Sequence, residues 1–510
     1  MAARILIVDY GSQTTEVIAR ALREEGYRSG ILDPVKAALW LREGNPTDAI
    51  ILSGGDKSVY DADALKLPKE VLLARRADGL LVPVLGICYG HQLLAYALGG
   101  AVEKMGAEHG CARIETAATS RMFGGLPMTQ EVWSNHSDSV VALPPSFRET
   151  ARSLGTGCVA AMESGNGRFF GVQFHPESPE TPYGKEMLLA FVRDRCGCRK
   201  DWEPAPLITS IGEEIRANIM NDLVVIPYSG GVDSSVVAAI GVRNLGTRAS
   251  GITLDAGNLR EGELDEIRAS AQHIGLYHNV ANAHADVALF ANTIDAEEKR
   301  RIFQSIYVSH IKVEIANRGA RFLFDGTLAP DEIESGARGG DRIKTHHNVG
   351  VDYGVKVFKP LRDFFKHEVR ALARELGLST NISERKPFPG PGNIIRVVGV
   401  PVTQERLAVV RLAYAQVEEV LKQDAKFYGN ISQLVVAYLG LNTTGIKGDK
   451  RAYDHAIAVR AVHTTDFMTA EGLWLPEAAV REIKSRVKHP FINRVFFDPT
   501  DKGPATVEYE

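Results

Sequence analysis

Short apolar runs alternate with helical stretches along residues 4–198. Residues 5–8, 49–52 and 82–85 are continuous apolar runs, and each is bounded by turn residues. Such runs are typical of strands in a parallel sheet that is covered on both faces. Because functional residues in these sheets lie at the carboxyl ends of the strands, we expect the chemistry where each run ends.

The same alternation resumes further along the chain. Apolar residues 223–228 predict a buried strand, residues 236–242 the start of a helix, and residues 250–254 a second strand. Residues 261–273 carry Leu264 and Ile267 on one face, which predicts an amphipathic helix. This region therefore also favours a parallel sheet with helices between its strands.

The last part of the chain has a different pattern. Residues 387–392 form a Pro- and Gly-rich run that fits neither helix nor regular strand. Beyond it, the pattern predicts strands at residues 393–398, 431–439, 456–462 and 494–497, and helices at residues 404–424 and 478–487. This mixture indicates an α+β domain, and strand edges of this kind often pair across a dimer.

The fold class expected is therefore two open parallel-sheet α/β domains followed by a smaller α+β domain. We place the first domain at residues 1–198 and a polar, Pro-rich linker at residues 199–206. The second α/β domain would span residues 207–386, and the C-terminal domain would span residues 387–510. A length of 510 residues agrees with about three domains.

Composition and charge exclude several classes of protein. Hydrophobic residues make up 45% and charged residues 24%, which is ordinary for a globular protein, and the net charge of −4 gives no basic balance to recruit nucleic acid. No stretch reaches the ~18 apolar residues of a membrane span, and the first residues predict a strand rather than a signal peptide. The five cysteines are scattered without a CxxC pair, so we expect no disulfide framework, no zinc site and a reducing cytoplasm.

A loop between the strand at 223–228 and the next helix has the composition of an anion site. Two glycines allow the backbone to approach a ligand, and free N–H groups at the helix start suit phosphate. Asp233 can hold Mg²⁺ beside the phosphates, because a hard cation prefers carboxylate oxygen. The residues expected to bind ATP here are Ser229, Gly230, Gly231, Val232, Asp233, Ser234 and Ser235.

This SGGVDSS loop is not a Walker loop, because no Gly-Lys-Ser/Thr follows it. It resembles the PP-loop ATP pyrophosphatases. That resemblance implies that the protein adenylates a carbonyl or carboxyl oxygen and releases pyrophosphate. A plain Gly-rich turn is the alternative, but the full seven-residue motif after a strand disfavours it.

Two strand ends in the first domain carry the pattern of a cysteine nucleophile. Gly86-Ile87-Cys88-Tyr89-Gly90 has the form of a nucleophile elbow, in which a sharp turn exposes the thiol at a helix N-terminus. His175 would take the thiol proton, and Glu177 would orient the imidazole.

The amide N–H of Tyr89, with one from the Gly54-Gly55 turn, would form the oxyanion hole. A lone cysteine is more often structural, and we interpret Cys111, Cys158, Cys196 and Cys198 in that way. GICYGHQ followed by GVQFHPE resembles the class I glutamine amidotransferases over the whole segment. The resemblance implies hydrolysis of glutamine through a γ-glutamyl thioester, with a triad of Cys88, His175 and Glu177.

A polar, Gly-rich tract covers residues 323–336 and 343–350. Its composition fits either a surface loop or a mobile lid over a nucleotide site. In a lid, Lys344 could neutralise pyrophosphate as it leaves, and Asp331 and Glu334 could bind Mg²⁺. The sequence alone leaves both interpretations open.

The chain as a whole resembles the family of glutamine-hydrolysing GMP synthases. The resemblance implies that ATP adenylates the C2 oxygen of xanthosine 5′-monophosphate (XMP), and that ammonia from glutamine then displaces AMP to give GMP. It also implies a homodimer formed through the C-terminal domain, with no nucleic-acid or membrane partner. By the same match, Arg396, Gln433, Lys502 and Glu508 would bind XMP.

Several positions depart from that family's pattern. Asp56 replaces a proline, Lys386 a histidine and Asn442 an arginine, while Val351 and Ala329 replace a glycine and an aromatic residue. The departures leave an alternative open, a paralogue that aminates another purine-like nucleotide or a specialised metabolite. A catalytically inactive nucleotide-binding protein is disfavoured, because the Cys88, His175 and SGGVDSS positions are all intact.

Overall fold

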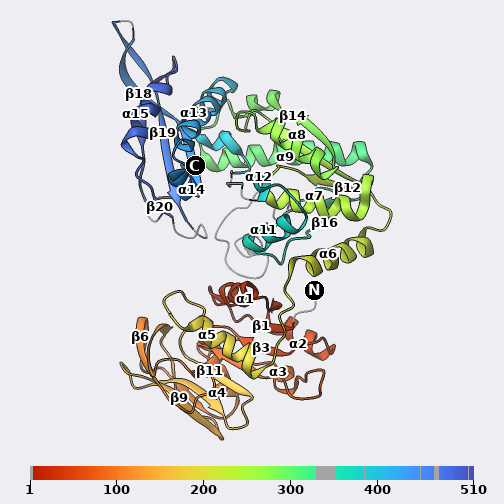
Figure 1. Cartoon of the computed structure of the whole chain (residues 1–510), viewed down its shortest axis with the longest axis vertical. Coiled ribbons are helices and arrows are strands. Elements are labelled where there is room, and N and C mark those ends of the chain that lie inside the picture. The colour runs from red at the N-terminus through yellow and green to blue at the C-terminus, as the bar shows by residue number, and fades with distance from the viewer. Residues whose placement is uncertain are drawn as a thin grey trace. The chain divides into compact units, whose positions relative to one another are not determined.

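The computed structural model describes residues 4–328, 351–383, 385–386, 388–447, 449–464, 470–502 and 505–510. Contacts divide the chain into two compact units, residues 1–207 and residues 208–510. Figure 1 labels the helices and strands of both units. Within the described ranges, no helix has the length and apolar character that a membrane crossing requires.

The first unit is built on a nine-stranded mixed sheet of order β2-β1-β3-β4-β11-β10-β9-β6-β7. The strands from β2 to β11 run parallel to their neighbours, and the strands from β10 to β7 extend the sheet in antiparallel fashion. The strands are β1 Ile5–Val8, β2 Ser29–Leu32, β3 Ala49–Leu52, β4 Val84–Ile87, β6 Glu108–Thr116, β7 Thr129–His136, β9 Phe147–Ser153, β10 Val159–Ser164 and β11 Phe169–Val172.

Helices and a small second sheet complete the first unit. The helices are α1 Thr15–Glu24, α2 Pro34–Arg42, α3 Lys69–Leu73, α4 Tyr89–Ala97 and α5 Gly184–Leu189, and the small sheet pairs β5 Ala101–Glu103 with β8 Ser139–Ala142. Every residue of β1, β3, β4 and β11 is buried, as expected for strands covered on both faces. The strand expected at 82–85 begins two residues later, because Pro83 precedes it.

The second unit begins with a five-stranded parallel sheet of order β14-β13-β12-β15-β16. Its strands are β12 Val224–Pro227, β13 Ala249–Asp255, β14 Tyr277–Asn282, β15 Phe322–Phe324 and β16 Lys356–Phe358. Its helices are α6 Pro204–Ile219, α7 Val232–Leu245, α8 Glu263–Ile274, α9 Ala296–Arg318, α11 Lys366–Glu375 and α12 Thr380–Ser383. Helix α6 begins at Pro204, so the last three residues of the expected linker are helical.

The rest of the second unit carries a mixed sheet packed against helices. Its strands are β17 Val397–Val398, β18 Gln433–Lys447, β19 Lys450–His463, β20 Glu471–Gly472 and β21 Ile492–Phe497, and its helices are α13 Gln404–Lys422, α14 Ala425–Asn430 and α15 Glu477–Arg486. In Figure 1 the hairpin of β18 and β19 extends away from helices α13 and α15. The expected fold class, two parallel-sheet α/β regions and a smaller α+β region, is confirmed.

Two expectations for this region were wrong in detail. Residues 392–396 form a 3₁₀ turn rather than a strand, and only Val397–Val398 pairs with β18. The turn forms because Asn393 is bound at both its amide and its side chain, by the carbonyls of Asn258 and Leu259 at 2.8 and 2.9 Å. Strand β18 also runs on to Lys447, well beyond the expected end at residue 439.

Candidate functional site

Cys88 lies at a sharp turn between strand β4 and helix α4. Its backbone has φ 51° and ψ −106°, and its amide donates to the carbonyl of Val172 on β11 at 2.8 Å. The flanking glycines are required by space. A Cβ on Gly86 would lie 2.3 Å from the carbonyl oxygen of Gly90, and a Cβ on Gly90 would lie 2.4 Å from that of Leu52. The elbow that the sequence predicts is therefore the local structure.

His175 and Glu177 lie beside this cysteine, just after strand β11. His175 Nδ1 is 2.8 Å from Glu177 Oε1, and Thr14 Oγ1 donates to the same oxygen at 2.5 Å. Both side chains of the pair are buried. Because the Glu177 carboxylate accepts the hydrogen bond from Nδ1–H, the Nε2 atom of the imidazole is left to exchange a proton with the thiol.

The charge state of His175 is set by its neighbours. Burial lowers the pKa of His175, but hydrogen bonds and charge interactions with Cys88 and Glu177 outweigh burial and raise the pKa to about 10. The ring therefore holds a proton readily and can give it to a leaving amine. This is the acid–base behaviour that thioester chemistry requires.

The Gly54-Gly55 turn lies against the triad. A Cβ on Gly54 would lie 3.2 Å from His175 Cε1, and a Cβ on Gly55 would lie 3.2 Å from Tyr89 Cγ. Within the described residues, the amides of Gly55 and Tyr89 donate to no protein acceptor. These two N–H groups therefore remain free to bind an oxyanion.

Two glutamines and an aspartate near Cys88 were not found from the sequence. Gln173 Nε2 lies 3.9 Å from Cys88 Sγ, and Gln92 Nε2 donates to the carbonyl of Asp138 at 2.7 Å and to Gln173 Oε1 at 3.2 Å. The Asp138 carboxylate accepts from Ser58 and Tyr60. Gln92 could have been found, because it follows Cys88 by four residues and so lies on the same face of α4.

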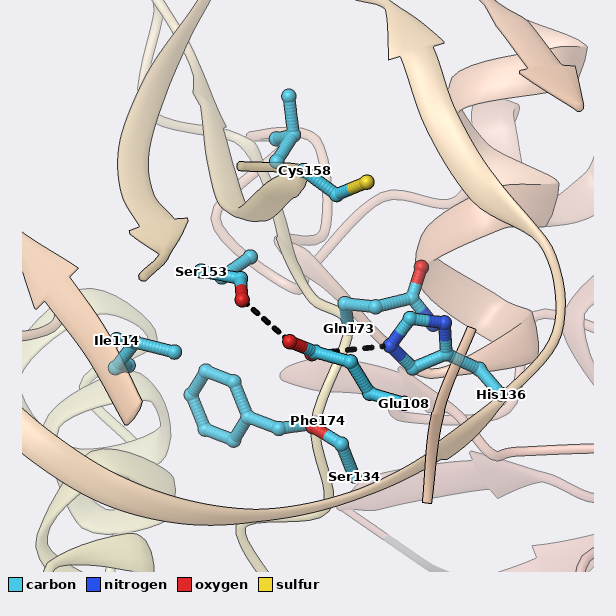
Figure 2. A pocket seen from close by; sticks show the side chains of 10 residues that line it. Glu108, Ile114, Ser134, His136, Ser153, Cys158, Gln173 and Phe174 are labelled. Carbon is cyan, nitrogen blue, oxygen red and sulfur yellow. Dashed lines mark hydrogen bonds and ion pairs between the residues drawn. The ribbon is translucent and has the colours of Figure 1, made fainter. Parts of the chain in front are cut away.

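A small cavity lies behind Gln173, within the antiparallel part of the sheet. Figure 2 shows Glu108 between Ser153 and His136, whose Nε2 lies 3.5 Å from Glu108 Oε2. His136 Nδ1 donates to the carbonyl of Asp138 at 3.0 Å. Gln173, which lies 3.9 Å from Cys88 Sγ, lines this cavity, and none of the triad residues does.

The SGGVDSS loop connects strand β12 to helix α7, as the pattern predicts. Gly230 has φ +68°, and the amide of Gly231 donates to Ser229 Oγ at 3.3 Å. The hydroxyl of Ser234 lies 3.2 Å from that of Ser229. The loop thus brings backbone and hydroxyl donors together at a helix N-terminus, where an anion binds favourably.

Two members of the motif face the interior of the domain. Ser235 is fully buried, and its hydroxyl lies 3.3 Å from the hydroxyl of Tyr228. Val232 is 3% exposed and belongs to the core under α7. The side chains of these two residues hold the loop in place.

Asp233 has one oxygen available for a cation. Its Oδ2 is 2.5 Å from the ammonium of Lys366, whereas its buried Oδ1 has no partner among the described residues. No group of three or more His, Cys, Asp or Glu side chains in the described ranges could hold a metal ion alone. Lys344, with Asp331 and Glu334, lies outside the described residues.

Three of the four residues expected to bind the acceptor nucleotide lie together. Arg396 is fully buried and donates to both carboxylate oxygens of Glu508, at 3.1 and 2.9 Å, and Gln433 Nε2 donates to Glu508 at 2.6 Å. Arg396 Nη1 is buried without an acceptor among the described residues. Lys502 belongs to the same C-terminal segment, and its amide donates to the carbonyl of Ala470 at 2.7 Å.

Family models match three consecutive parts of the chain. Residues 6–194 match the class-I glutamine amidotransferase model, residues 205–390 the NAD synthase model, and residues 419–509 the model of the GMP synthase C-terminal domain. The order agrees with the fold, because each match covers one of the sheets described above.

Full-length relatives extend over nearly the whole chain. A GMP synthase [glutamine-hydrolyzing] from Lactobacillus delbrueckii subsp. bulgaricus is 39% identical over 99% of this chain and 98% of its own length. Those from Thermomicrobium roseum and Aeropyrum pernix are 40% and 38% identical over 99% of this chain and 96% and 98% of their own lengths. Among solved structures, a glutamine amidotransferase from Thermotoga maritima is 23% identical with a TM-score of 0.27, and the match covers 38% of this chain and 84% of that protein.

Proposed function

The chain belongs to the family of glutamine-hydrolysing GMP synthases, and from this premise we propose which residues carry each step of the reaction. The enzyme converts XMP to GMP, with glutamine as the nitrogen donor and ATP as co-substrate. The full-length relatives do not favour the alternative of a paralogue that aminates another acceptor.

Glutamine hydrolysis takes place at Cys88. The thiol attacks the side-chain amide carbon, the C–N bond breaks, and His175 gives its proton to the departing ammonia. Water then attacks the thioester carbon, His175 takes a proton from it, and the Cys88 sulfur leaves with glutamate released. The N–H groups of Gly55 and Tyr89 stabilise the oxyanion of each tetrahedral intermediate, and Glu177 keeps the imidazole oriented.

Adenylation of XMP takes place at the Ser229–Ser235 loop. The N–H groups of Gly230, Gly231 and Val232 and the hydroxyls of Ser229 and Ser234 hold the phosphates, and Lys344 neutralises the pyrophosphate as it forms. Adenylation is needed because an amide carbonyl oxygen is a very poor leaving group. Ammonia passed directly from the glutaminase stays unprotonated, so its lone pair can attack C2.

Asp233 would hold a Mg²⁺ ion beside the phosphates. Its unpartnered, buried Oδ1 supports this assignment, since Mg²⁺ usually takes one or two carboxylates and completes its shell with phosphate oxygens and water. The ion would neutralise the charge that develops on the phosphates. The ammonium of Lys366 lies 2.5 Å from the other carboxylate oxygen, Oδ2, and would hold the Asp233 side chain in this orientation.

The acceptor nucleotide binds beside Arg396, Gln433 and Glu508, with Lys502 on the same C-terminal segment. The observation that supports this site is the free Nη1 donor of Arg396, which is buried and aimed at no protein acceptor in the described structure. Glu508 and Gln433 offer hydrogen bonds to hydroxyl or base edges, and Lys502 offers a cation for the phosphate.

A homodimer through the β18–β19 hairpin is the proposed assembly. Beyond residue 439, strand β18 pairs with β19 but with no other strand among the described residues, so its outer edge is unpaired. Leu441, Ile446 and Tyr453 on it are 54%, 81% and 64% exposed. An unpaired edge with exposed apolar side chains is a common site of self-association, and sedimentation of an Ile446→Lys variant tests it.

The five unbridged cysteines support a cytoplasmic location.

Substitutions at the two centres test the division of labour. The observation that carries it is Cys88 at a strained elbow beside a His175–Glu177 pair. We expect Cys88→Ala to abolish GMP formation from glutamine and to retain GMP formation from ammonium salts. Asp233→Asn should lose both activities. Equal loss of both activities in Cys88→Ala would contradict the two-centre assignment.

A further inference from the structure

A largely buried arginine, Arg385, fixes one peptide plane of the SGGVDSS loop. Arg385 Nη1 donates to the carbonyl oxygen of Gly230 at 2.7 Å. Because the peptide group is planar and trans, this contact also fixes the N–H of Gly231, which points the opposite way. That N–H donates to the Ser229 hydroxyl at 3.3 Å, within the loop proposed to bind the phosphates. Arg385 therefore controls whether one phosphate donor faces the ligand.

Arg385 is in turn held by Glu263, the first residue of helix α8. Arg385 Nη2 is 2.5 Å from Glu263 Oε1, and Glu263 is only 4% exposed. The same carboxylate accepts from the amide of Arg260 at 2.7 Å and from its guanidinium at 3.3 Å. One buried carboxylate thus orients two arginines from different segments.

The second arginine leads to the acceptor-nucleotide cluster. The guanidinium of Arg260 lies 5.1 Å from the centre of the Phe388 ring, and the guanidinium of Arg396 lies 4.5 Å from the centre of the same ring. Both distances are within the range of a cation–π interaction. Arg396 then binds Glu508, which binds Gln433. The contacts are therefore continuous from Gly230 to the residues proposed to hold XMP.

We propose that Glu263 is a positioning residue shared by the two halves of the adenylation site. Through Arg385 it sets the phosphate-facing N–H of Gly231, and through Arg260 and Phe388 it sets Arg396. The inference rests on the proposed roles of the SGGVDSS loop and of Arg396. It adds that the geometries of the two binding sites depend on one another.

The proposed role of Glu263 rests on the charges of Glu263 and the two arginines. Arg260, Arg385 and Glu263 carry two positive charges and one negative charge in a largely buried place, with side-chain exposures of 14%, 14% and 5%, and the only further carboxylate paired with Arg385 in the described structure is that of Glu266, 71% exposed and 3.8 Å away. Without the carboxylate, the two guanidinium groups would repel one another and lose their common acceptor. Each would then move, one away from Gly230 and the other away from Phe388.

The test measures the effect of each arginine on the KM of each substrate. With ammonium salts as nitrogen source, pyrophosphate release is measured while ATP and XMP are varied in turn. Arg385→Lys keeps the charge but loses the fork, so the KM for ATP should rise about tenfold with little change in the KM for XMP. Arg260→Lys should instead raise the KM for XMP, with little change in the KM for ATP. Glu263→Gln should raise both KM values by about tenfold.

Two controls separate this role from a merely structural one. Asp265→Asn removes an acid from the same first turn of α8, where its side chain is 84% exposed and pairs with Arg268, and should change neither KM. The double variant Glu263→Gln, Arg385→Lys should have a KM for ATP no higher than the larger of the two single variants. Thermal unfolding of each variant monitors folding.

Parallel changes in both KM values for Arg385→Lys and Arg260→Lys would overturn the inference, as would an unchanged KM for either substrate in Glu263→Gln. Asp233→Asn and Arg396→Lys are assayed alongside. If these two leave adenylation intact, the proposed function fails. If they impair adenylation while the arginine variants show no split, only the shared positioning role fails.

Discussion

Cys88 adopts a backbone conformation that other L-residues rarely occupy. A φ of 51° with ψ of −106° carries a strain of about 1–3 kcal/mol. The carbonyl of Cys88 accepts from the amides of His91 and Gln92, both at 3.1 Å, and its amide is bound to β11. These hydrogen bonds hold the residue in place, so the thiol, although only 5% exposed, stays at the start of helix α4 beside His175.

His175 makes the free energy of unfolding depend on pH. Its folded pKa of about 10 lies above the ordinary value of 6.5, so the imidazolium stabilises the folded protein. That contribution is fully present below about pH 6.5 and is lost as the pH rises through about 10. Urea unfolding of the parent and of His175→Gln should therefore show a difference that shrinks between pH 6.5 and 10.

The comparison with His175→Gln removes the effect of other groups that titrate in the same range. Cys88→Ala supplies a second check, because the hydrogen bond with Cys88 is the largest single cause that raises the pKa of His175. In that variant the decline should begin at a lower pH. A stability difference that stays constant from pH 6 to pH 10 would contradict the charge assigned to His175.

The strand–turn–helix element around Cys88 depends on close backbone contact. Gly86→Ala would place a Cβ 2.3 Å from the carbonyl oxygen of Gly90, where only backbone atoms could move. We expect a loss of about 1–3 kcal/mol in the free energy of unfolding, together with loss of glutamine-driven activity. Thermal unfolding and the glutaminase assay measure the two effects.

Gly124 provides the matched control for that element. It lies in the same unit, has no positive φ, and an added Cβ would meet nothing within 4 Å. Gly124→Ala should leave both the unfolding temperature and the activity unchanged. A comparable loss in both variants would show that the unit is sensitive to any added methyl group, and not to the elbow in particular.

Elements with a strong local pattern could be predicted from the sequence, and those fixed by distant contacts could not. The strands at residues 5–8 and 49–52 have their expected bounds, because a wholly apolar run between turn residues has few other places in a fold. The turn at 392–396 was missed because its hydrogen-bond partners, Asn258 and Leu259, lie far away in sequence.

The same distinction applies to the candidate site. Cys88, His175 and Glu177 belong to compact motifs, so their grouping could be predicted. Gln173 and Asp138 act through partners 85 and 46 residues away, Cys88 and Gln92, and no local pattern reveals such contacts. Lys299 illustrates the same limit: it is fully buried and binds the carbonyl of Val397 and the Glu510 carboxylate.

On the scale of the whole molecule, the second unit has a core that crosses the expected boundary at residue 387. Leu254, Phe290 and Phe303 of the SGGVDSS region belong to the same buried cluster as Leu407 and Val410 of helix α13. The cluster of the first unit contains only residues between 6 and 169. Among the described residues, the clusters of the two units are separate, whereas one cluster spans both parts of the second unit, beside a smaller cluster around Val225, Ile311 and Leu323.

A fragment comparison tests this shared core. Residues 204–386 alone would expose the faces of Leu254, Phe290, Phe303 and Ile306 that helix α13 and its neighbours cover. Each large apolar side chain returned to water costs about 1.5–3 kcal/mol, and a few such losses equal the whole stability of a typical domain. We therefore expect residues 204–386 to lack a cooperative thermal transition, whereas residues 204–510 and residues 1–203 should each unfold cooperatively. A sharp transition of residues 204–386 at the temperature found for residues 204–510 would contradict the shared core, because the region would then be stable without the C-terminal segment.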